Sequence, residues 1–195
     1  MQEKIGIHTD IQSKEVSYIF HQMFTDWLGM GWSFTDLSGL DSGQYLFTIS
    51  YAKEPSSQAD LCLGRSDWSF NEEEWMDSPL ISAAGLVGFK KVVQGALGFD
   101  FFATLFFTLT RKEETYSSDD WDRHGRFSYE YSLLESHHLL ERPFLEEYIQ
   151  FLVAQMTKKG LKVDCRKSPH VLTMDLDFAF EWYARPLPLI LASLI

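Results

Sequence analysis

The sequence predicts the α/β class, with a mixed sheet and helices packed on it in a single main domain. Three observations lead to this prediction. Short β-like runs alternate with an amphipathic stretch early in the chain, an almost unbroken apolar stretch begins at Phe99, and a helix with clear start and stop signals begins at Pro143. Strands and helices in such alternation typically form a sheet covered by helices.

The composition narrows the function classes. The chain has 195 residues, of which 45% are hydrophobic and 15% aromatic, as expected of a globular domain with a substantial core. Its formal net charge of −11 argues against nucleic acid or an anionic membrane surface as partner, because both require a basic face. Cys62 and Cys165 lie far apart without metal-ligand spacing, so neither a disulfide framework nor a zinc cluster is indicated. Neither a signal peptide nor an apolar run of about 20 residues occurs, which predicts a cytoplasmic protein.

The first elements are a strand and a helix. Lys4–His8 predicts a short strand, and Asp10 or Ser13 is expected to cap a helix that runs to about Leu28. Gly29 follows as a helix stop. Apolar positions at helical spacing give this helix one wide face, formed by Val16, Ile19, Phe20, Met23, Phe24 and Trp27.

Three further strands are expected at Trp32–Phe34, Tyr45–Tyr51 and Ala59–Leu63. The second of these alternates well enough to place one face on the core. The glycines between Leu80 and Gly98 match neither nucleotide-binding spacing, so a phosphate site has little support. A hairpin through Val92 and Val93 is the expected structure there.

The polar stretch between residues 64 and 79 contains Trp68, Phe70 and Trp75 among carboxylates. Exposed rings flanked by acids are typical of sugar-binding surfaces. The alternative is that the rings pack a long loop onto the domain, and we favour it because large aromatic side chains are usually buried.

The stretch from Phe99 to Leu109 is apolar all round, which predicts a buried helix. Charged residues crowd its end and the segment after it: Arg111, Glu113, Glu114, Asp122, His124 and Arg126. A structural ion-pair network is the favoured interpretation, because a buried charge is rarely left unpaired, and a binding site is the alternative. His137 and His138 are adjacent, so their side chains diverge and a metal site there is not expected.

The clearest helix begins at Pro143, with Glu146 and Glu147 in its first turn, and stops at Gly160. Residues 161–170 are basic and polar and are interpreted as a linker. Val171–Asp177 predicts a short strand, and the apolar segment Phe178–Ile195 is expected to dock on its own domain or to form a homodimer.

A family resemblance rests on Phe99, Asp100, Ala103, Phe106, Arg111, Glu113 and Glu114, followed by Asp122, residues 124–127 and residues 140–143. The pattern resembles an uncharacterised N-terminal α/β domain found in bacterial proteins ahead of a polysaccharide-deacetylase-like catalytic domain. The likeness is strongest over residues 99–148. It returns at Val171–Asp177, which looks like the first strand of that catalytic domain.

The resemblance implies roles for two carboxylates. Asp175 matches the general base of such enzymes and Asp177 a ligand of a divalent, zinc-like metal, in a complete parent protein only. The alternative is that both residues end an ordinary strand. No cofactor is expected in this chain, because its histidines all precede the strand.

The expected organisation is an accessory domain at 1–160, a linker at 161–170 and the start of an incomplete deacetylase-like domain at 171–195. The resemblance implies a non-catalytic role in carbohydrate metabolism, in which the domain positions the catalytic domain or its glycan. A stand-alone protein-interaction or small-ligand module is the alternative. A hydrolase using Glu113, Glu114 and His124 is a third, weaker interpretation.

Overall fold

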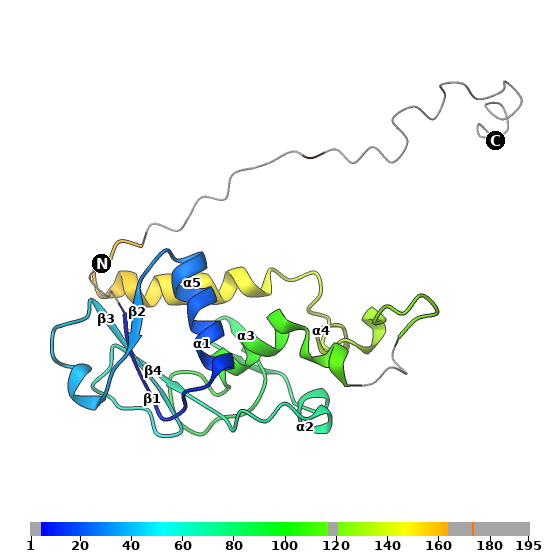
Figure 1. Cartoon of the computed structure of the whole chain (residues 1–195), viewed down its shortest axis with the longest axis horizontal. Coiled ribbons are helices and arrows are strands. Elements are labelled where there is room, and N and C mark those ends of the chain that lie inside the picture. The colour runs from blue at the N-terminus through cyan, green and yellow to red at the C-terminus, as the bar shows by residue number, and fades with distance from the viewer. Residues whose placement is uncertain (1–4, 117–120, 164–172, 174–195) are drawn as a thin grey trace, which may run out of the picture.

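The computed structural model describes residues 5–116, 121–163 and 173, and within them the protein has an α/β fold (Figure 1). The strands are β1 (Ile5–Thr9), β2 (Trp32–Phe34), β3 (Phe47–Ala52), β4 (Leu61–Gly64), β5 (Ile81–Ala83) and β6 (Leu86–Gly88). The helices are α1 (Lys14–Phe20), α2 (Glu72–Met76), α3 (Phe101–Thr110), α4 (Leu133–Ser136) and α5 (Phe144–Lys158). A π-helix, η1 (His21–Trp27), continues α1, and single 3-10 turns form η2 (Leu37–Gly39), η3 (Lys112–Thr115) and η4 (Tyr129–Tyr131).

The parallel and antiparallel strands lie in separate sheets. Four strands form a parallel sheet in the order β2-β1-β3-β4, and β5 and β6 form a small antiparallel sheet. The chain moves from β1 to one neighbour, β2, and then to the other, β3. This reversal is the point at which the carboxyl ends of parallel strands commonly hold ligands.

One face of the parallel sheet packs against helices. Tyr51 of β3 meets the ring of Phe20 from α1 at 6.0 Å and that of Phe102 from α3 at 5.0 Å. All three side chains are fully buried. The strand and helix predicted before Leu28 therefore supply about a quarter of the buried core residues, on the face that their periodicity indicates.

The opposite face of the sheet is covered by loops instead of helices. Gly6 of β1 lies against the ring of Tyr45, where a Cβ atom would overlap that ring. Ser50 of β3 accepts a hydrogen bond from the Ser56 N–H at 2.8 Å, and the Cys62 thiol donates to the Ser56 carbonyl at 3.0 Å. β3 is thus buried on both faces, whereas its alternation predicts burial on one.

Helix α3 is buried from Phe101 to Phe107, as predicted, and joins the sheet to α5. The ring of Phe101 lies 4.6 Å from that of Tyr148 in α5. The Tyr148 hydroxyl donates to the carbonyl of Val87 in β6 at 2.6 Å. The long helix α5 therefore fastens the antiparallel hairpin to the main core (Figure 1).

The predicted capping and stop residues are confirmed at several helix ends. The Ser13 hydroxyl caps α1 by accepting from Val16, and Gly29 and Gly160 take left-handed conformations with φ of 65° and 83°. Pro143 occupies the N-cap position of α5, one residue earlier than the first helical position predicted for it.

The prediction of a hairpin through Val92 and Val93 is wrong. The hairpin turns at Ala84 and Gly85, which both have positive φ, because these residues allow the tight reversal between β5 and β6. The chain does reverse between Lys91 and Phe99, which form an isolated antiparallel bridge, but residues 92–98 between them form a loop along β4, whose Cys62 carbonyl accepts from the Ala96 N–H at 2.8 Å.

The tryptophans between residues 64 and 79 pack onto the domain, as favoured from the sequence. Trp75 is 1% exposed and stacks on Phe107 at 4.2 Å, and Trp68 donates to the Tyr51 hydroxyl at 2.6 Å. No helix among the residues that the structure describes is long and apolar enough to cross a membrane.

Candidate functional site

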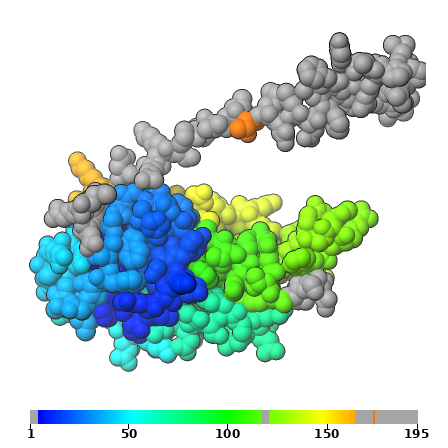
Figure 2. Space-filling view, viewed as in Figure 1, coloured from blue at the N-terminus to red at the C-terminus, as the bar shows by residue number. Residues whose placement is uncertain are grey.

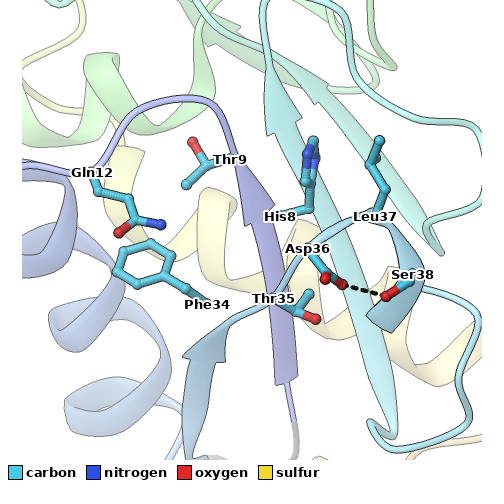
Figure 3. A pocket seen from close by; sticks show the side chains of 8 residues that line it. All are labelled: His8, Thr9, Gln12, Phe34, Thr35, Asp36, Leu37 and Ser38. Carbon is cyan, nitrogen blue, oxygen red and sulfur yellow. Dashed lines mark hydrogen bonds between the residues drawn. The ribbon is translucent and has the colours of Figure 1, made fainter.

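A groove of about 800 Å³ opens at the carboxyl ends of β1 and β2 (Figure 3). It is lined by the end of β1, the connection between β1 and α1, the end of β2 and the turn that follows it. The lining side chains are His8, Thr9, Gln12, Phe34, Thr35, Asp36, Leu37 and Ser38.

Parallel pairing of the two strands assembles this groove. β1 and β2 pair in register, with Ile7 opposite Phe34, so the polar residues that follow each strand meet at one edge of the sheet. Figure 3 shows His8, Asp36 and Leu37 on one side of β1, with Gln12 and Phe34 on the other. The groove therefore crosses the sheet edge from one face to the other.

Asp36 provides a fixed negative charge in the groove. Its carboxylate accepts from the Ser38 hydroxyl at 2.7 Å and from the Gly39 N–H at 2.9 Å, which also caps η2. The hydrogen bond from Ser38 holds the pKa of the Asp36 carboxyl below its ordinary value, with the Gly39 N–H acting in the same direction. Asp36 is exposed, so its oxygens also remain open to a ligand.

His8 is held by a pair of serines beneath the groove. Its Nδ1 lies 3.1 Å from the Oγ of Ser50, which is fully buried and also accepts from the Ser56 N–H. The imidazole is half-buried and forms part of the groove wall.

Phe34 and Leu37 supply the apolar part of the lining. The Phe34 ring packs at 5.3 Å from Trp32 and 6.1 Å from Phe20, and Leu37 is 51% exposed. Lysine and arginine are absent from the described lining, so this groove does not favour an anionic ligand.

The strand order reverses between β1 and β3, and an ion pair closes the space at the carboxyl ends of these two strands. Asp10, directly after β1, accepts from Arg65 and from the Lys53 N–H at 3.2 Å. Burial acts to raise the pKa of the Asp10 carboxyl, but the hydrogen bond from Arg65, the Lys53 N–H and the charge of Arg65 together outweigh it, and the pKa lies below its ordinary value. The open groove is therefore displaced toward β2.

The prediction that Arg111 forms a buried ion pair is wrong. Arg111 pairs with Glu114 at 2.8 Å, but both side chains are exposed, at 54% and 41%. Arg111 ends α3 in a left-handed conformation, with φ of 48°, which turns its side chain away from the core. A surface pair of this kind contributes about 0–1 kcal/mol, less than the roughly 3–5 kcal/mol that breaking a buried pair costs.

Glu113 lies inward, apart from its neighbours in sequence. It is 5% exposed and accepts from the Ser132 hydroxyl at 3.0 Å and the Leu133 N–H at 2.8 Å. These bonds satisfy the N-terminus of α4, which gives Glu113 a structural role.

Asp122, His124 and Arg126 form a second, local group. The Asp122 carboxylate accepts from the His124 N–H at 2.8 Å and from Arg126 Nη2 at 2.7 Å. The hydrogen bond from the Arg126 side chain lowers the pKa of the Asp122 carboxyl. No hydrogen bond between described residues joins this group to Arg111 or Glu114, so the six charged residues do not make one cluster.

The metal-ligand candidates give no site in the part of the chain that the structure describes. Within residues 5–116, 121–163 and 173, no three His, Cys, Asp or Glu side chains are grouped to hold a metal ion. The ring of His137 lies 5.4 Å from that of Phe89. Asp175, Asp177 and the segment 178–195 lie outside the described residues.

Sequence reasoning did not identify the groove. The signal is present as polar residues at the ends of two strands, His8-Thr9 in β1 and Thr35-Asp36 after β2. Such residues converge only if the two strands are parallel neighbours, and the sequence does not reveal the strand order.

Comparison with known proteins gives one family match. The model of a family described as a family of unknown function (DUF7033) matches residues 5–161, which covers most of the chain and all of its described strands and helices. No curated protein and no solved structure matches the chain.

Proposed function

The chain belongs to the DUF7033 family of unknown function, and from that starting point we propose that it is a non-catalytic glycan-binding accessory domain. The ligand is a neutral, hydroxyl-rich glycan bound in the groove at the carboxyl ends of β1 and β2. In a complete protein the domain would position the glycan for a deacetylase-like catalytic domain that follows it and carries the metal.

The observation that carries the proposal is the mixture of side chains in this groove. Phe34 and Leu37 offer apolar surface to the C–H groups of a sugar ring. The Asp36 carboxylate accepts hydroxyl protons, and Gln12 offers both a donor and an acceptor. Small-ligand sites commonly combine an apolar wall with a few polar groups in this way.

The residues that carry the family resemblance support an accessory role. Phe99, Ala103 and Phe106 are buried in the core, and Asp100 caps α3. Arg142 bonds Glu147 at 2.7 Å and the Gly85 carbonyl at 3.0 Å. Since these residues stabilise the fold, the resemblance concerns the type of domain and does not point to a catalysed reaction.

A hydrolytic role for the groove has little support. Ser50 and His8 resemble a nucleophile and its base, but the Ser50 side chain is fully buried and no substrate atom can reach it. Binding is therefore the role that we propose for the described groove.

Calorimetric titration with tetra-N-acetylchitotetraose, cellotetraose and an oligogalacturonate tests the proposal. We expect at least one of the neutral glycans to bind with a dissociation constant of about 1 mM or below. The oligogalacturonate should bind more weakly because its carboxylates face Asp36. Asp36→Asn removes the charged acceptor and should weaken neutral-glycan binding roughly tenfold.

Asp77→Asn serves as the matched control, because Asp77 is exposed and lies outside the groove lining. Binding by this variant should equal that of the wild type. If neither neutral glycan causes heat or shifts amide resonances of residues 8–12 and 34–38, the proposal is wrong.

A second candidate, a protein-interaction module, is favoured by the loop at residues 121–131. Trp121, Tyr129 and Tyr131 are 46%, 61% and 50% exposed, and the surrounding segment projects from the body of the molecule in Figure 2. Exposed Trp and Tyr side chains are typical of binding surfaces between proteins.

A further inference from the structure

We infer that His8 is the specificity-determining residue of the groove, because its Nε2–H is a hydrogen-bond donor held in a fixed tautomer. Ser50 is the positioning residue that fixes this tautomer. The choice of a glycan ligand rests on the proposed function, whereas the tautomer rests only on contacts within the domain.

The hydrogen bonds of Ser50 determine which ring nitrogen carries the proton. One lone pair of the Ser50 hydroxyl oxygen is used by the Ser56 N–H at 2.8 Å. The hydroxyl proton must find an acceptor because Ser50 is fully buried, and His8 Nδ1, at 3.1 Å, is the acceptor that the described residues provide. Nδ1 is then unprotonated, and the neutral imidazole carries its proton on Nε2.

The opposite tautomer would place two protons at the same contact. If Nδ1–H donated to the Ser50 oxygen, the Ser50 hydroxyl proton would be left without an acceptor in a buried position. Folded proteins avoid unsatisfied buried donors of this kind. The Ser50 hydroxyl therefore selects which ring nitrogen of His8 carries the proton, as carboxylates and carbonyls do behind other functional histidines.

The free end of the imidazole is available to a ligand. Nε2 has no hydrogen-bond partner among the described residues, and it is not counted among their buried unsatisfied atoms. His8 lines the groove on the same side of β1 as Asp36 (Figure 3). The groove lining thus contains one donor, the Nε2–H of His8, and one charged acceptor, the carboxylate of Asp36.

This pairing defines the chemistry of the ligand. The ligand presents an acceptor oxygen to His8 and a hydroxyl or N–H donor to Asp36, as adjacent polar groups on a sugar ring do. It also separates glycan binding from metal binding, because a metal requires the Nε2 lone pair that this tautomer does not offer.

Nitrogen-15 NMR of the uniformly labelled full chain at neutral pH tests the tautomer directly. Long-range correlations to the imidazole carbon-bound protons should show His8 Nδ1 as an unprotonated nitrogen and Nε2 as a protonated one. Ser50→Ala removes the hydroxyl that donates to Nδ1, and the two nitrogen resonances of His8 should move toward the values of a mixture of tautomers. A protonated Nδ1 in the wild type would overturn the inference, whatever the variant does.

Titration with the neutral glycan that binds best tests the donor role. His8→Leu should weaken binding roughly tenfold, the loss of about one hydrogen bond. His8→Gln, which keeps an N–H near the position of Nε2, should recover most of the affinity. His124→Leu is the matched control, since His124 is exposed in the loop at 121–131 and should not affect binding.

Glycan binding and the His8 tautomer can be tested independently of each other. If the wild type binds no glycan but shows the expected tautomer, the proposed function is wrong and the assignment of the ring proton stands. If a glycan binds and folded His8→Leu binds it as tightly as the wild type, the donor role is wrong. Zinc binding that displaces the Nε2 proton would also contradict it.

Discussion

The buried carboxylate of Asp100 connects three parts of the core. It is fully buried and accepts from the Tyr51 hydroxyl at 2.8 Å, the Ser66 N–H at 2.7 Å and the Ala103 N–H at 3.0 Å. The Ser66 hydroxyl adds a fourth bond at 2.9 Å. One side chain therefore ties β3, the segment after β4 and the first turn of α3 together.

Replacing Asp100 with Asn should destabilise the fold by about 2–3 kcal/mol at pH 7. An amide has only one acceptor oxygen, so at least one donor now satisfied by Asp100 Oδ2 loses its partner in a buried position. Urea unfolding followed by circular dichroism measures the change. Asp77→Asn is the control, because Asp77 is exposed, and it should change stability by less than about 0.5 kcal/mol. Asp60→Asn would not be suitable, because Asp60 binds Thr48 and Lys159.

The stability of the wild type relative to Asp100→Asn should increase as the pH is lowered from 7 toward 3.8, the ordinary pKa of this carboxyl. Burial raises the pKa of the Asp100 carboxyl above its ordinary value of 3.8, although the Ala103 and Ser66 N–H groups act against this rise. The folded state then holds this proton more tightly than the unfolded state, so the stability that Asp100 contributes is lost as the pH rises through its folded pKa. The Asn variant lacks this proton. A stability difference that shrinks on acidification would contradict the assigned direction.

For single residues, the sequence shows which side chains belong to a family pattern more readily than it shows what those side chains contact. Asp100 belongs to the pattern that resembles a known domain, yet nothing local shows that Tyr51 and Ser66 reach it across 49 and 34 residues. By contrast, Asp122 and Arg126 pair within one loop, which their spacing makes predictable. His8 and Asp36 were not recognised because strand pairing alone brings them to one groove.

At the scale of elements, the small hairpin and α3 depend on a close approach. Gly88 in β6 faces the ring of Phe99, and a Cβ atom at Gly88 would overlap that ring. Phe99 is 1% exposed and also packs at 6.2 Å from Tyr148, so it has little room to move. This contact sets the distance between the hairpin and the core.

Gly88→Ala should therefore destabilise the protein by about 1–3 kcal/mol through overpacking. Gly98→Ala is the matched control, because its Cβ would lie 3.6 Å from Ile81, an ordinary contact. The free energies of unfolding in urea compare the two. Equal stability of the two variants would show that Phe99 gives way and that the approach is not tight.

Helices were predictable because their signals are local, whereas the hairpin was not. Ser13 and Gly29 mark the limits of one helical segment, and Gly160 follows the end of α5. The turn of the β5–β6 hairpin instead uses Ala84, a residue with no strong turn preference, followed by Gly85. A hairpin was predicted at Val92-Val93, a pair of β-branched residues, but this pair lies in a loop beside β4.

At the scale of the whole molecule, the chain should release no acetate from acetylated chitooligosaccharides and should hold no stoichiometric zinc. Catalysis of this class needs several metal ligands and an open position for water, and the resemblance supplies only Asp175 and Asp177. Metal analysis of the purified chain and an acetate assay measure both properties. One equivalent of bound zinc, or turnover that Asp175→Asn abolishes, would show that the chain is itself an enzyme.

The fold class was predictable from the alternation of strands and helices, but the architecture of the sheet was not. Apolar runs such as β3 do not reveal which strands become neighbours. The short connection from β3 to β4 contains no helix, so the sequence gives no sign that these two strands are parallel. The groove depends on that architecture, which is why composition and spacing did not locate it.

The position of α5 at the end of the described domain has a consequence for synthesis. Tyr148, Leu152 and Met156 are fully buried, and Tyr148 covers Phe99 and Phe101. A nascent chain that has emerged only as far as α4 therefore exposes the apolar side of α3 to solvent and to other chains. The domain can close only after α5 has emerged from the ribosome, so the time until α5 emerges sets how long the unfinished chain is open to aggregation or to chaperones.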